Sequence, residues 1–215
     1  MKKVGGDLKI SKLTNEKYLN LFCVEYKKKG IKWLLASRRD ADKLEILNKS
    51  KNADAVNILP YSVDKDGEIE VYLIREFRHA IGDYIYSVPA GLVENNKTEE
   101  QSVKAEIYEE IGGEVVSCKC VDKNVYTTVG LTDEKISFFE AEVKIVGKQH
   151  LEKTEEIELV SVPLKKVEKM LDDKKIAIDL KGRYSLRHFV ENQKIAKLEK
   201  QNAELIAKLK QKPKV

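Results

Sequence analysis

Apolar residues along the chain gather into short segments that are separated by polar turns. Residues 18–26 and 31–37 are rich in aromatic and aliphatic side chains and flank the turn KKKG, so they predict a β-hairpin. A mainly polar connection, residues 40–54, follows. Residues 55–63 and 68–78 flank a turn that contains Asp-Gly, which predicts a second hairpin and places the start of the main domain near Ala53.

The second half of the chain alternates between predicted strands and helices. Residues 115–128, 136–146 and 157–164 have the composition of strands, and residues 163–173 predict a short helix. The sequence contains no internal repeat. Strands interleaved with helices predict a mixed α/β (α+β) domain.

One further helix is marked at both of its ends. Thr98 and Gln101 have the spacing of a capping box, and Gly112 or Gly113 suits a helix end. We therefore predict a helix over Glu99–Ile111. Its buried stripe consists of Val103, Ile107 and Ile111.

Three carboxylates crowd the last turns of this helix. Glu106 and Glu110 lie on the stripe beside the core edge, and Glu109 lies on the neighbouring face. Like charges at these spacings each destabilise an isolated helix by about 0.2–0.5 kcal/mol, and a divalent cation would reverse that sign. Carboxylate oxygens are the ligands that Mg²⁺ and Mn²⁺ prefer. The helix alone leaves two interpretations open, a metal site and a solvated acidic face.

Composition places the chain among globular proteins. Its 215 residues suit one large domain, or one domain with an appendage, and 42% hydrophobic content is enough for a core. No run of eighteen apolar residues and no secretory signal is present, so we expect a cytoplasmic location and no membrane partner. Cys23, Cys118 and Cys120 are expected to be reduced thiols, and the scattered histidines do not predict a histidine-metal centre.

The net charge of +4 comes from the end of the chain. Residues 191–215 hold seven lysines and three glutamates, which sum to +4, so the other 190 residues are balanced. A basic surface for nucleic acid is therefore not predicted. The same segment has a heptad pattern, whose a and d positions are Ile195, Leu198, Asn202, Leu205 and Leu209.

This heptad pattern resembles a short parallel coiled coil and favours a homodimer. An asparagine at an a position, Asn202, is typical of two-stranded pairs, and Lys194 at g would face Glu199 at e of the partner. The alternative is a helix that packs the same stripe on its own domain.

The segment from Gly91 to Gly113 resembles the signature of the Nudix hydrolases, Gly-x5-Glu-x7-Arg-Glu-U-x-Glu-Glu-x-Gly-U, in which U is a bulky aliphatic residue. The matching positions are Gly91, Glu106, Ile107, Glu109, Glu110 and Gly112. Lys97, Ala105 and Gly113 depart from the pattern. The flanking segments LIREFRHAIGDYIYSVPAGLVE, VYTTVGLTDEKISFFEAEV and HLEKTEEIELVSVPL resemble ADP-ribose pyrophosphatases, so the similarity covers about residues 55–171.

The resemblance implies a Nudix fold, in which a mixed sheet is sandwiched between helices, and a divalent cation, Mg²⁺ or Mn²⁺, bound beside a nucleotide diphosphate. By resemblance, Glu106, Glu110 and the backbone carbonyl of Ala90 bind the metal, and Glu109 is a further ligand or a base. The general base or another ligand is expected from an acidic loop. The candidates in that loop are Glu152, Glu155 and Glu156, and Glu155 is our choice.

Four residues are expected to contact the substrate. Arg78, and after it Arg75, would bind phosphate, because a guanidinium matches phosphate oxygens in pairs; the alternative is a strand-edge arginine paired with an acid. Glu134 fits the pattern of the pyrophosphatases. Trp33 either stacks on the adenine of a neighbouring subunit or is simply packed.

The departures from the signature bear on the rate and on the substrate. Lys97 and Ala105 replace both members of an ion pair of the family, which is more tolerable than the loss of one member. We predict weaker metal affinity or slower turnover, and not a complete loss. Val129 and Ser87 stand where the pyrophosphatases commonly carry Pro and Glu, which makes the catalytic class a firmer prediction than the substrate.

Together the observations predict three parts: an N-terminal β-hairpin unit and connection (1–52), a Nudix domain (53–190) and a C-terminal helical tail (191–215). The expected activity is Mg²⁺-dependent hydrolysis of ADP-ribose, or a related nucleoside diphosphate sugar, to two monophosphates. One alternative is a catalytically impaired Nudix domain that binds nucleotide as a sensor or assembly module. Another is an enzyme that removes oxidised nucleoside triphosphates, which the long N-terminal unit disfavours.

Overall fold

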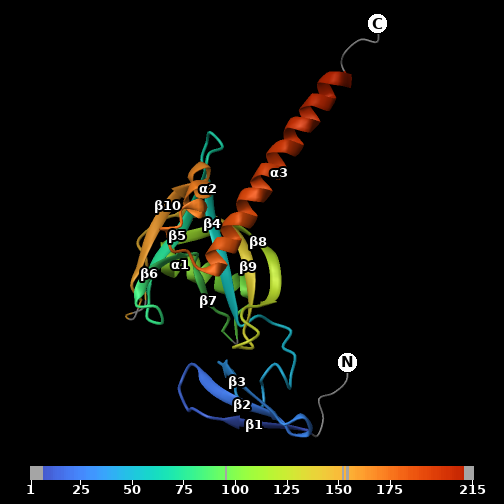
Figure 1. The fold of residues 1–215 in the computed structure, drawn as a ribbon. Coiled ribbons are helices and arrows are strands. Elements are labelled where there is room, and N and C mark those ends of the chain that lie inside the picture. Colours follow the sequence, from blue (N-terminus) through green and yellow to red (C-terminus); the bar gives the residue numbers. More distant parts are fainter. Residues whose placement is uncertain (1–6, 95, 152, 154, 211–215) are drawn as a thin grey trace.

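The computed structural model describes residues 7–94, 96–151, 153 and 155–210. Within these residues the chain forms two β-sheets and three α-helices (Figure 1). The strands are β1 (Leu8–Lys12), β2 (Asn20–Tyr26), β3 (Ile31–Ser37), β4 (Ala55–Val63), β5 (Ile69–Arg78), β6 (Asp83–Ser87), β7 (Ala90–Leu92), β8 (Gly113–Tyr126), β9 (Lys135–Ile145) and β10 (Ile157–Pro163). The helices are α1 (Glu99–Ile111), α2 (Leu164–Asp172) and α3 (Leu180–Lys210).

The N-terminal strands form a small antiparallel sheet of their own, in the order β1, β2, β3. The predicted hairpin is confirmed: β2 and β3 are joined by a short 3₁₀ turn that ends at Gly30, whose φ of +63° favours glycine. Strand β1 is an addition that the sequence pattern did not indicate. Figure 1 shows this sheet set apart from the main body.

The main sheet follows the path β10, β5, β4, β9, β8, with β6 paired to β5 and β7 paired to β4. The β4–β9 pairing is parallel and the other pairings are antiparallel, so the sheet is mixed. The predicted Asp-Gly turn joins β4 to β5, where Gly67 has a φ of +82°. This topology brings β5, β7 and the end of α1 to one edge of the domain.

Helices cover both faces of the main sheet. On one face α1 buries Val103, Ile107 and Ile111 against β4, β5 and β9. On the other face α2 and α3 bury a second cluster, which contains Val167, Leu186 and Phe189, against β4 and β5. The predicted mixed sheet sandwiched between helices is thereby confirmed.

The connection between the two sheets is held by a buried ion network. Glu45, which is 2% exposed, accepts hydrogen bonds from Lys135 and Tyr126 and lies 2.9 Å from an Arg39 guanidinium nitrogen. Arg39 also pairs with Asp54 at 2.5 Å. Burial pushes the pKa of Glu45 up, but these cationic and hydroxyl partners outweigh it and hold that pKa below its ordinary value.

The C-terminal helix is longer than the sequence pattern predicted. We expected a helical tail from residue 191, whereas α3 begins at Leu180 and passes without a break through the predicted boundary at 190. Asp179 supplies the start signal, because its carboxylate accepts a hydrogen bond from the amide of Gly182 at 2.7 Å. Gly182 has a low helix propensity, so the sequence pattern did not predict a helix there. The glycine is needed at this position because a Cβ would lie 3.2 Å from the Cα of Ser87. Glycine therefore lets α3 approach β6.

The cysteines and the helices of the described residues bear on two simpler expectations. All three cysteines are free thiols, as expected, and Cys118 and Cys120 lie on β8. Burial raises the pKa of both of these thiols, which keeps them protonated. No helix among the described residues has the length and apolar character that crossing a membrane requires.

Candidate active site

The carboxylate-bearing helix α1 has the predicted bounds and the predicted caps. The hydroxyl of Thr98 accepts a hydrogen bond from the Gln101 amide at 3.2 Å, and the Gln101 side chain accepts one from the Thr98 amide at 2.8 Å. Gly112 ends the helix with a φ of +63°. These local signals fix which residues of α1 face the sheet and which face its edge.

Strand β7 packs directly on two of the helix carboxylates. The amide of Ala90 donates a hydrogen bond to Glu110 Oε2 at 3.2 Å. A Cβ on Gly91 would lie only 1.7 Å from Glu106 Oε1, so the Glu106 carboxylate occupies the space that any other residue at position 91 would fill. The signature glycine is therefore required by contact with the signature glutamate.

Glu110 and Ala90 border a polar cleft of about 250 Å³ between β5, β7, α1 and the start of β10, and Glu106 lies on α1 against the neighbouring Gly91. Five of the predicted site residues line it, and they are Arg78, Ala90, Glu110, Glu155 and Glu156. Glu76 and His79 also line it, although the sequence analysis did not select them. The structure thus brings together side chains that are up to 80 positions apart in the chain.

Glu110 is a buried carboxyl group with other carboxylates as neighbours. It is 5% exposed, and burial together with the charges of Glu106 and Glu76 raises the pKa of the Glu110 carboxyl well above its ordinary range. The charge of Glu155 acts in the same direction, and the hydrogen bond from the Ala90 amide opposes it. Four carboxylates within electrostatic reach of one another create a strongly negative site.

Glu76 is the carboxylate that sequence reasoning missed. It lies on β5, two residues beyond the buried Ile74, and its Oε1 is 2.5 Å from Arg78 Nη2. Burial raises the pKa of Glu76, and the Arg78 charge partly offsets this. The period-two alternation of a strand places Ile74, Glu76 and Arg78 on the same face, and that pattern was visible in the sequence.

The acidic loop is tied to the end of α1 by backbone and side-chain contacts. The side-chain Nε2 of Gln149 donates a hydrogen bond to the carbonyl of Glu110 at 2.6 Å, and it lies 3.3 Å from the carbonyl of Ile157. The His150 amide donates to the carbonyl of Glu109 at 2.7 Å, and the His150 ring stacks on Tyr108. These contacts hold the loop before β10 against the carboxylate turn of α1.

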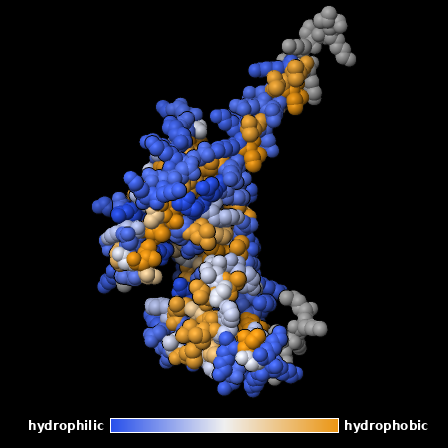
Figure 2. Space-filling view, viewed as in Figure 1, coloured by the Kyte–Doolittle hydropathy of each residue, from blue (hydrophilic) through white to orange (hydrophobic). Residues whose placement is uncertain are grey.

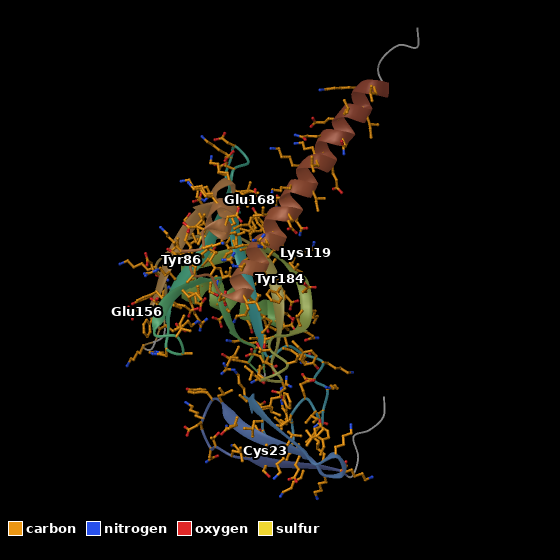
Figure 3. The ribbon with its side chains drawn as sticks, in the orientation of Figure 1. Cys23, Tyr86, Lys119, Glu156, Glu168 and Tyr184 are labelled. Carbon is orange, nitrogen blue, oxygen red and sulfur yellow. The ribbon has the colours of Figure 1, made fainter. Side chains whose placement is uncertain are left out.

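The acidic-loop candidates differ in their surroundings. Glu156 accepts a hydrogen bond from the Tyr84 hydroxyl, and Figure 3 shows Glu156 at the sheet edge near β6. Glu155 lines the cleft, and its charge acts on both Glu110 and Glu76. Glu152, the third candidate, lies outside the described residues.

Several other predicted residues lie elsewhere. Arg75 pairs with Glu158 at 3.2 Å and stacks over the Tyr84 ring, and it is not among the residues that line the carboxylate cleft. Glu134 accepts a hydrogen bond from Thr127 and lines a different, mainly apolar pocket beside the start of α3. Trp33 is 52% exposed on β3 of the small sheet. Glu109 is half-buried on α1.

Lys97 and Ala105, which depart from the signature, lie before and on α1, and they form no ion pair of the family's kind with each other. The Lys97 ammonium lies 3.1 Å from Glu94, in an exposed pair just before α1. Ala105 is half-buried on α1 and offers no polar group toward that loop. The loop before α1 is therefore braced by a short-range surface pair, which contributes at most about 1 kcal/mol.

The donor set of the cleft fits a divalent cation of the magnesium type. A buried carboxylate, two neighbouring carboxylates and a backbone carbonyl are hard oxygen donors, and burial together with the neighbouring carboxylates raises the pKa of Glu110. Among the described residues no three acidic, histidine or cysteine side chains converge on a single point in a preformed cage. Sites completed by water and substrate phosphate have this open character.

Comparison with known proteins finds relatives whose names refer to the hydrolysis of ADP-sugars and ADP-ribose. No family model matches the chain. It is 35% identical to a mouse ADP-sugar pyrophosphatase over 79 residues, a match that spans 36% of the mouse protein and 34% of this chain. It is 29% identical to the ADP-ribose pyrophosphatase of Bacillus subtilis over 152 residues, which cover 69% of this chain and 76% of the relative.

A third relative and a solved structure complete the comparison. The crystal structure of an ADP compounds hydrolase matches the fold with a TM-score of 0.63 at 14% identity, over 86% of this chain and 93% of the other. An uncharacterised Nudix hydrolase of Schizosaccharomyces pombe is 30% identical over 141 residues, which cover 60% of this chain and 67% of the relative. With the signature helix and its carboxylate cleft in place, the chain belongs to the Nudix hydrolase family.

Proposed function

We propose that the chain hydrolyses the diphosphate bond of ADP-ribose, or of a closely related nucleoside diphosphate sugar, in a reaction that needs a divalent cation. The observation that carries this proposal is the buried Glu110 at the centre of a carboxylate cleft that also contains an arginine, Arg78. The names of two relatives, an ADP-sugar pyrophosphatase and an ADP-ribose pyrophosphatase, support the substrate class.

Glu106, Glu110 and the carbonyl of Ala90 are the groups that would hold the cation, with Glu109 as a further ligand or base. A bound Mg²⁺ or Mn²⁺ would neutralise the diphosphate and lower the pKa of a coordinated water. The hydrogen bond from the Ala90 amide holds one oxygen of Glu110, a residue that lines the cleft, and the other oxygen would bind the cation. Gly91 keeps Glu106 close to this strand.

Arg78 and Glu155 supply the remaining functions. The Arg78 guanidinium, which pairs with Glu76, would bind a phosphate oxygen and stabilise the charge that develops on it. Glu155, an exposed residue that lines the cleft, would accept a proton from the attacking water. Glu156, which also lines the cleft and accepts a hydrogen bond from the Tyr84 hydroxyl, is the second choice. The water oxygen forms a bond to phosphorus, one bridging P–O bond breaks, and two monophosphates leave.

The test is release of AMP and ribose 5-phosphate from ADP-ribose, measured with Mg²⁺, with Mn²⁺ and with a chelator, beside a panel of nucleoside diphosphate sugars. We expect metal-dependent release and a loss of at least about a hundredfold in kcat for Glu110→Gln, because the principal metal carboxylate is gone. Glu114→Gln, which changes a glutamate on β8 outside the cleft, should keep the wild-type rate.

Two outcomes would contradict the proposal. Release that persists with chelator, or that survives Glu110→Gln, would remove the carboxylate cleft from the reaction. Failure of a folded protein to hydrolyse any member of the panel would favour the alternative of a nucleotide-binding module, which calorimetric titration with ADP-ribose would then measure. The cytoplasmic location expected from the sequence stays a prediction.

A further inference from the structure

The second half of α3 leaves the body of the molecule. Figure 1 shows the helix extending well beyond α2 and the main sheet. The last contact of α3 with α2 is the ion pair between Lys194 and Glu168, at 2.5 Å, and Figure 3 marks Glu168 beside the helix. From Ile195 onward, the described side chains of the helix are exposed. This projecting segment, residues 195–209, spans about 21 Å at 1.5 Å per residue.

The projecting segment carries an apolar stripe that its own domain does not cover. Its large apolar side chains are between 52% and 58% exposed, and they are Ile195, Leu198, Leu205, Ile206 and Leu209. Figure 2 shows these apolar patches along the projecting helix, separated by polar surface. The alternative of packing on its own domain is therefore contradicted in this structure. An exposed stripe of this size on a helix usually marks an interaction surface.

We propose that the projecting segments of two copies of this chain pair as a parallel, in-register coiled coil. Ile195, Leu198, Leu205 and Leu209 occupy alternating a and d positions, which is the pattern of a two-stranded seam, and Ile206 flanks this seam at an e position. The proposal is independent of the proposed hydrolysis.

Polar positions of the segment select a second copy as the partner. Asn202 interrupts the stripe at an a position. In an in-register pair the two copies of Asn202 can hydrogen-bond with each other. In any other alignment each Asn202 would be buried against apolar side chains of the partner. In the parallel arrangement Glu199 of the partner lies beside Lys194, whose ammonium already pairs with Glu168. The Lys194 ammonium would then contact Glu168 of its own copy and Glu199 of the partner. This contact favours a parallel orientation of the two helices.

The short length of the stripe is compensated by the way α3 is anchored. An isolated helix of about fifteen residues is marginal in water, because forming its first turn is unfavourable. In this chain the helix is already nucleated by its first half, where Leu186 is fully buried and Phe189 is 1% exposed. Association therefore does not have to form the helix and only has to bury the stripe.

Sedimentation equilibrium of the full chain tests the proposal. Leu205→Lys places a charge in the seam, and Ala203→Lys places the same charge on the opposite side of the same exposed helix turn. We expect the monomer–dimer dissociation constant to rise at least tenfold for Leu205→Lys and to stay within twofold of wild type for Ala203→Lys. Far-ultraviolet circular dichroism should show that both variants keep their helix content.

Cysteine crosslinking separates the parallel pair from other arrangements. In a parallel, in-register pair, each stripe residue faces its own copy, so Leu198→Cys and Leu205→Cys should each form an interchain disulfide under mild oxidation. Ala203→Cys and the wild type, with its own three cysteines, set the background. The proposal is overturned if neither stripe cysteine crosslinks above background, if only one does, as in an antiparallel pair, or if both lysine variants associate like wild type.

Discussion

Glu110 contributes to the way in which the stability of the metal-free protein depends on pH. The pKa of its carboxyl is higher in the folded protein than its ordinary value of 4.5, so the folded state binds the proton more tightly than the unfolded state does. The free energy of unfolding should therefore decrease as pH rises above 4.5, until the folded carboxyl has ionised. This dependence is the opposite of that of an acid held ionised by a salt bridge.

We predict that Glu110→Gln stabilises the chelator-treated protein at neutral pH. Removal of a buried charge that lacks a cation should raise Tm by about 2–4 °C for each kcal/mol gained, and the gain should shrink as pH falls toward 5. Thermal unfolding at pH 5 and pH 8 measures both effects. Glu109→Gln, a half-buried position on the same helix, serves as the control. An equal or lower Tm for Glu110→Gln at pH 8 would show that burial does not destabilise this carboxylate.

The two candidate arginines can be separated by kinetics. Arg78 lies in the cleft beside Glu76, whereas Arg75 pairs with Glu158 outside it. We predict that Arg78→Lys raises KM for ADP-ribose about tenfold, since lysine cannot bind phosphate in a bidentate way. The matched variant Arg75→Lys should change KM by less than about threefold. A larger effect at Arg75 would mean that the substrate lies along a different path.

Among single residues, the sequence predicted those whose spacing matches the Nudix signature. The helix carboxylates Glu106 and Glu110 follow from the signature, and Glu110 is among the residues that line the cleft. Glu76 was not predicted, because a single acid in a strand has no motif and its role depends on α1 packing against β5. Gln149 was missed for the same reason: its two carbonyl partners belong to different elements.

Among the elements, strand β7 and helix α1 depend on each other through one contact. The Cβ of any residue at position 91 would collide with the Glu106 carboxylate. We predict that Gly91→Ala displaces Glu106, weakens Mg²⁺ binding at least tenfold and lowers kcat to a similar extent, while the protein still folds. Calorimetric titration with Mg²⁺ and circular dichroism measure the two parts of this prediction.

Gly147→Ala is the matched control for that substitution. A Cβ at Gly147 meets nothing within 4 Å, so the same added methyl group should leave metal binding unchanged. If Gly91→Ala binds Mg²⁺ as well as Gly147→Ala does, then Glu106 is not needed close to β7. The comparison isolates the steric effect from the general effect of glycine on the unfolded chain.

The elements that sequence reasoning found are those with local signals. Helix α1 has a capping box and a glycine end, and the β4–β5 hairpin has its Asp-Gly turn, so both could be placed without the fold. Strands β6 and β7 are five and three residues long and are strands only because β5 and β4 pair with them. The start of α3 was missed because Gly182 disfavours a helix locally and is needed for contact with β6.

In the whole molecule, the ion network around Glu45 fastens the connection between the two sheets. Glu45 is held ionised in the folded state, with a pKa below its ordinary value of 4.5. Its contribution to stability is therefore present above pH 4.5 and is lost as pH falls through the lower, folded pKa. The small N-terminal sheet is joined to the main body by this connection and by the hydrogen bond from the Ala36 amide to the Leu131 carbonyl.

We predict that Glu45→Gln destabilises the protein at pH 7 by about 3 kcal/mol, because Arg39 and Lys135 stay buried without their shared counter-charge. The loss should become smaller as pH falls below 4.5. Urea unfolding at pH 7 and pH 4 measures the change. Glu68→Gln breaks an exposed pair with Lys165 and should cost less than about 1 kcal/mol. Equal losses for the two variants would argue against the network as an anchor.

The continuous helix α3 projects from the molecule as a rigid rod. Its 31 residues form a rod about 45 Å long, and its first half is fixed in the core by Leu186 and Phe189. Rotation about the axis of this rod displaces less solvent than end-over-end rotation, so tumbling is anisotropic. A fluorescent or spin label near residue 208 would therefore report the reorientation of the entire body, and the rod could serve as a stiff arm that carries a fused protein at a constant distance from the cleft.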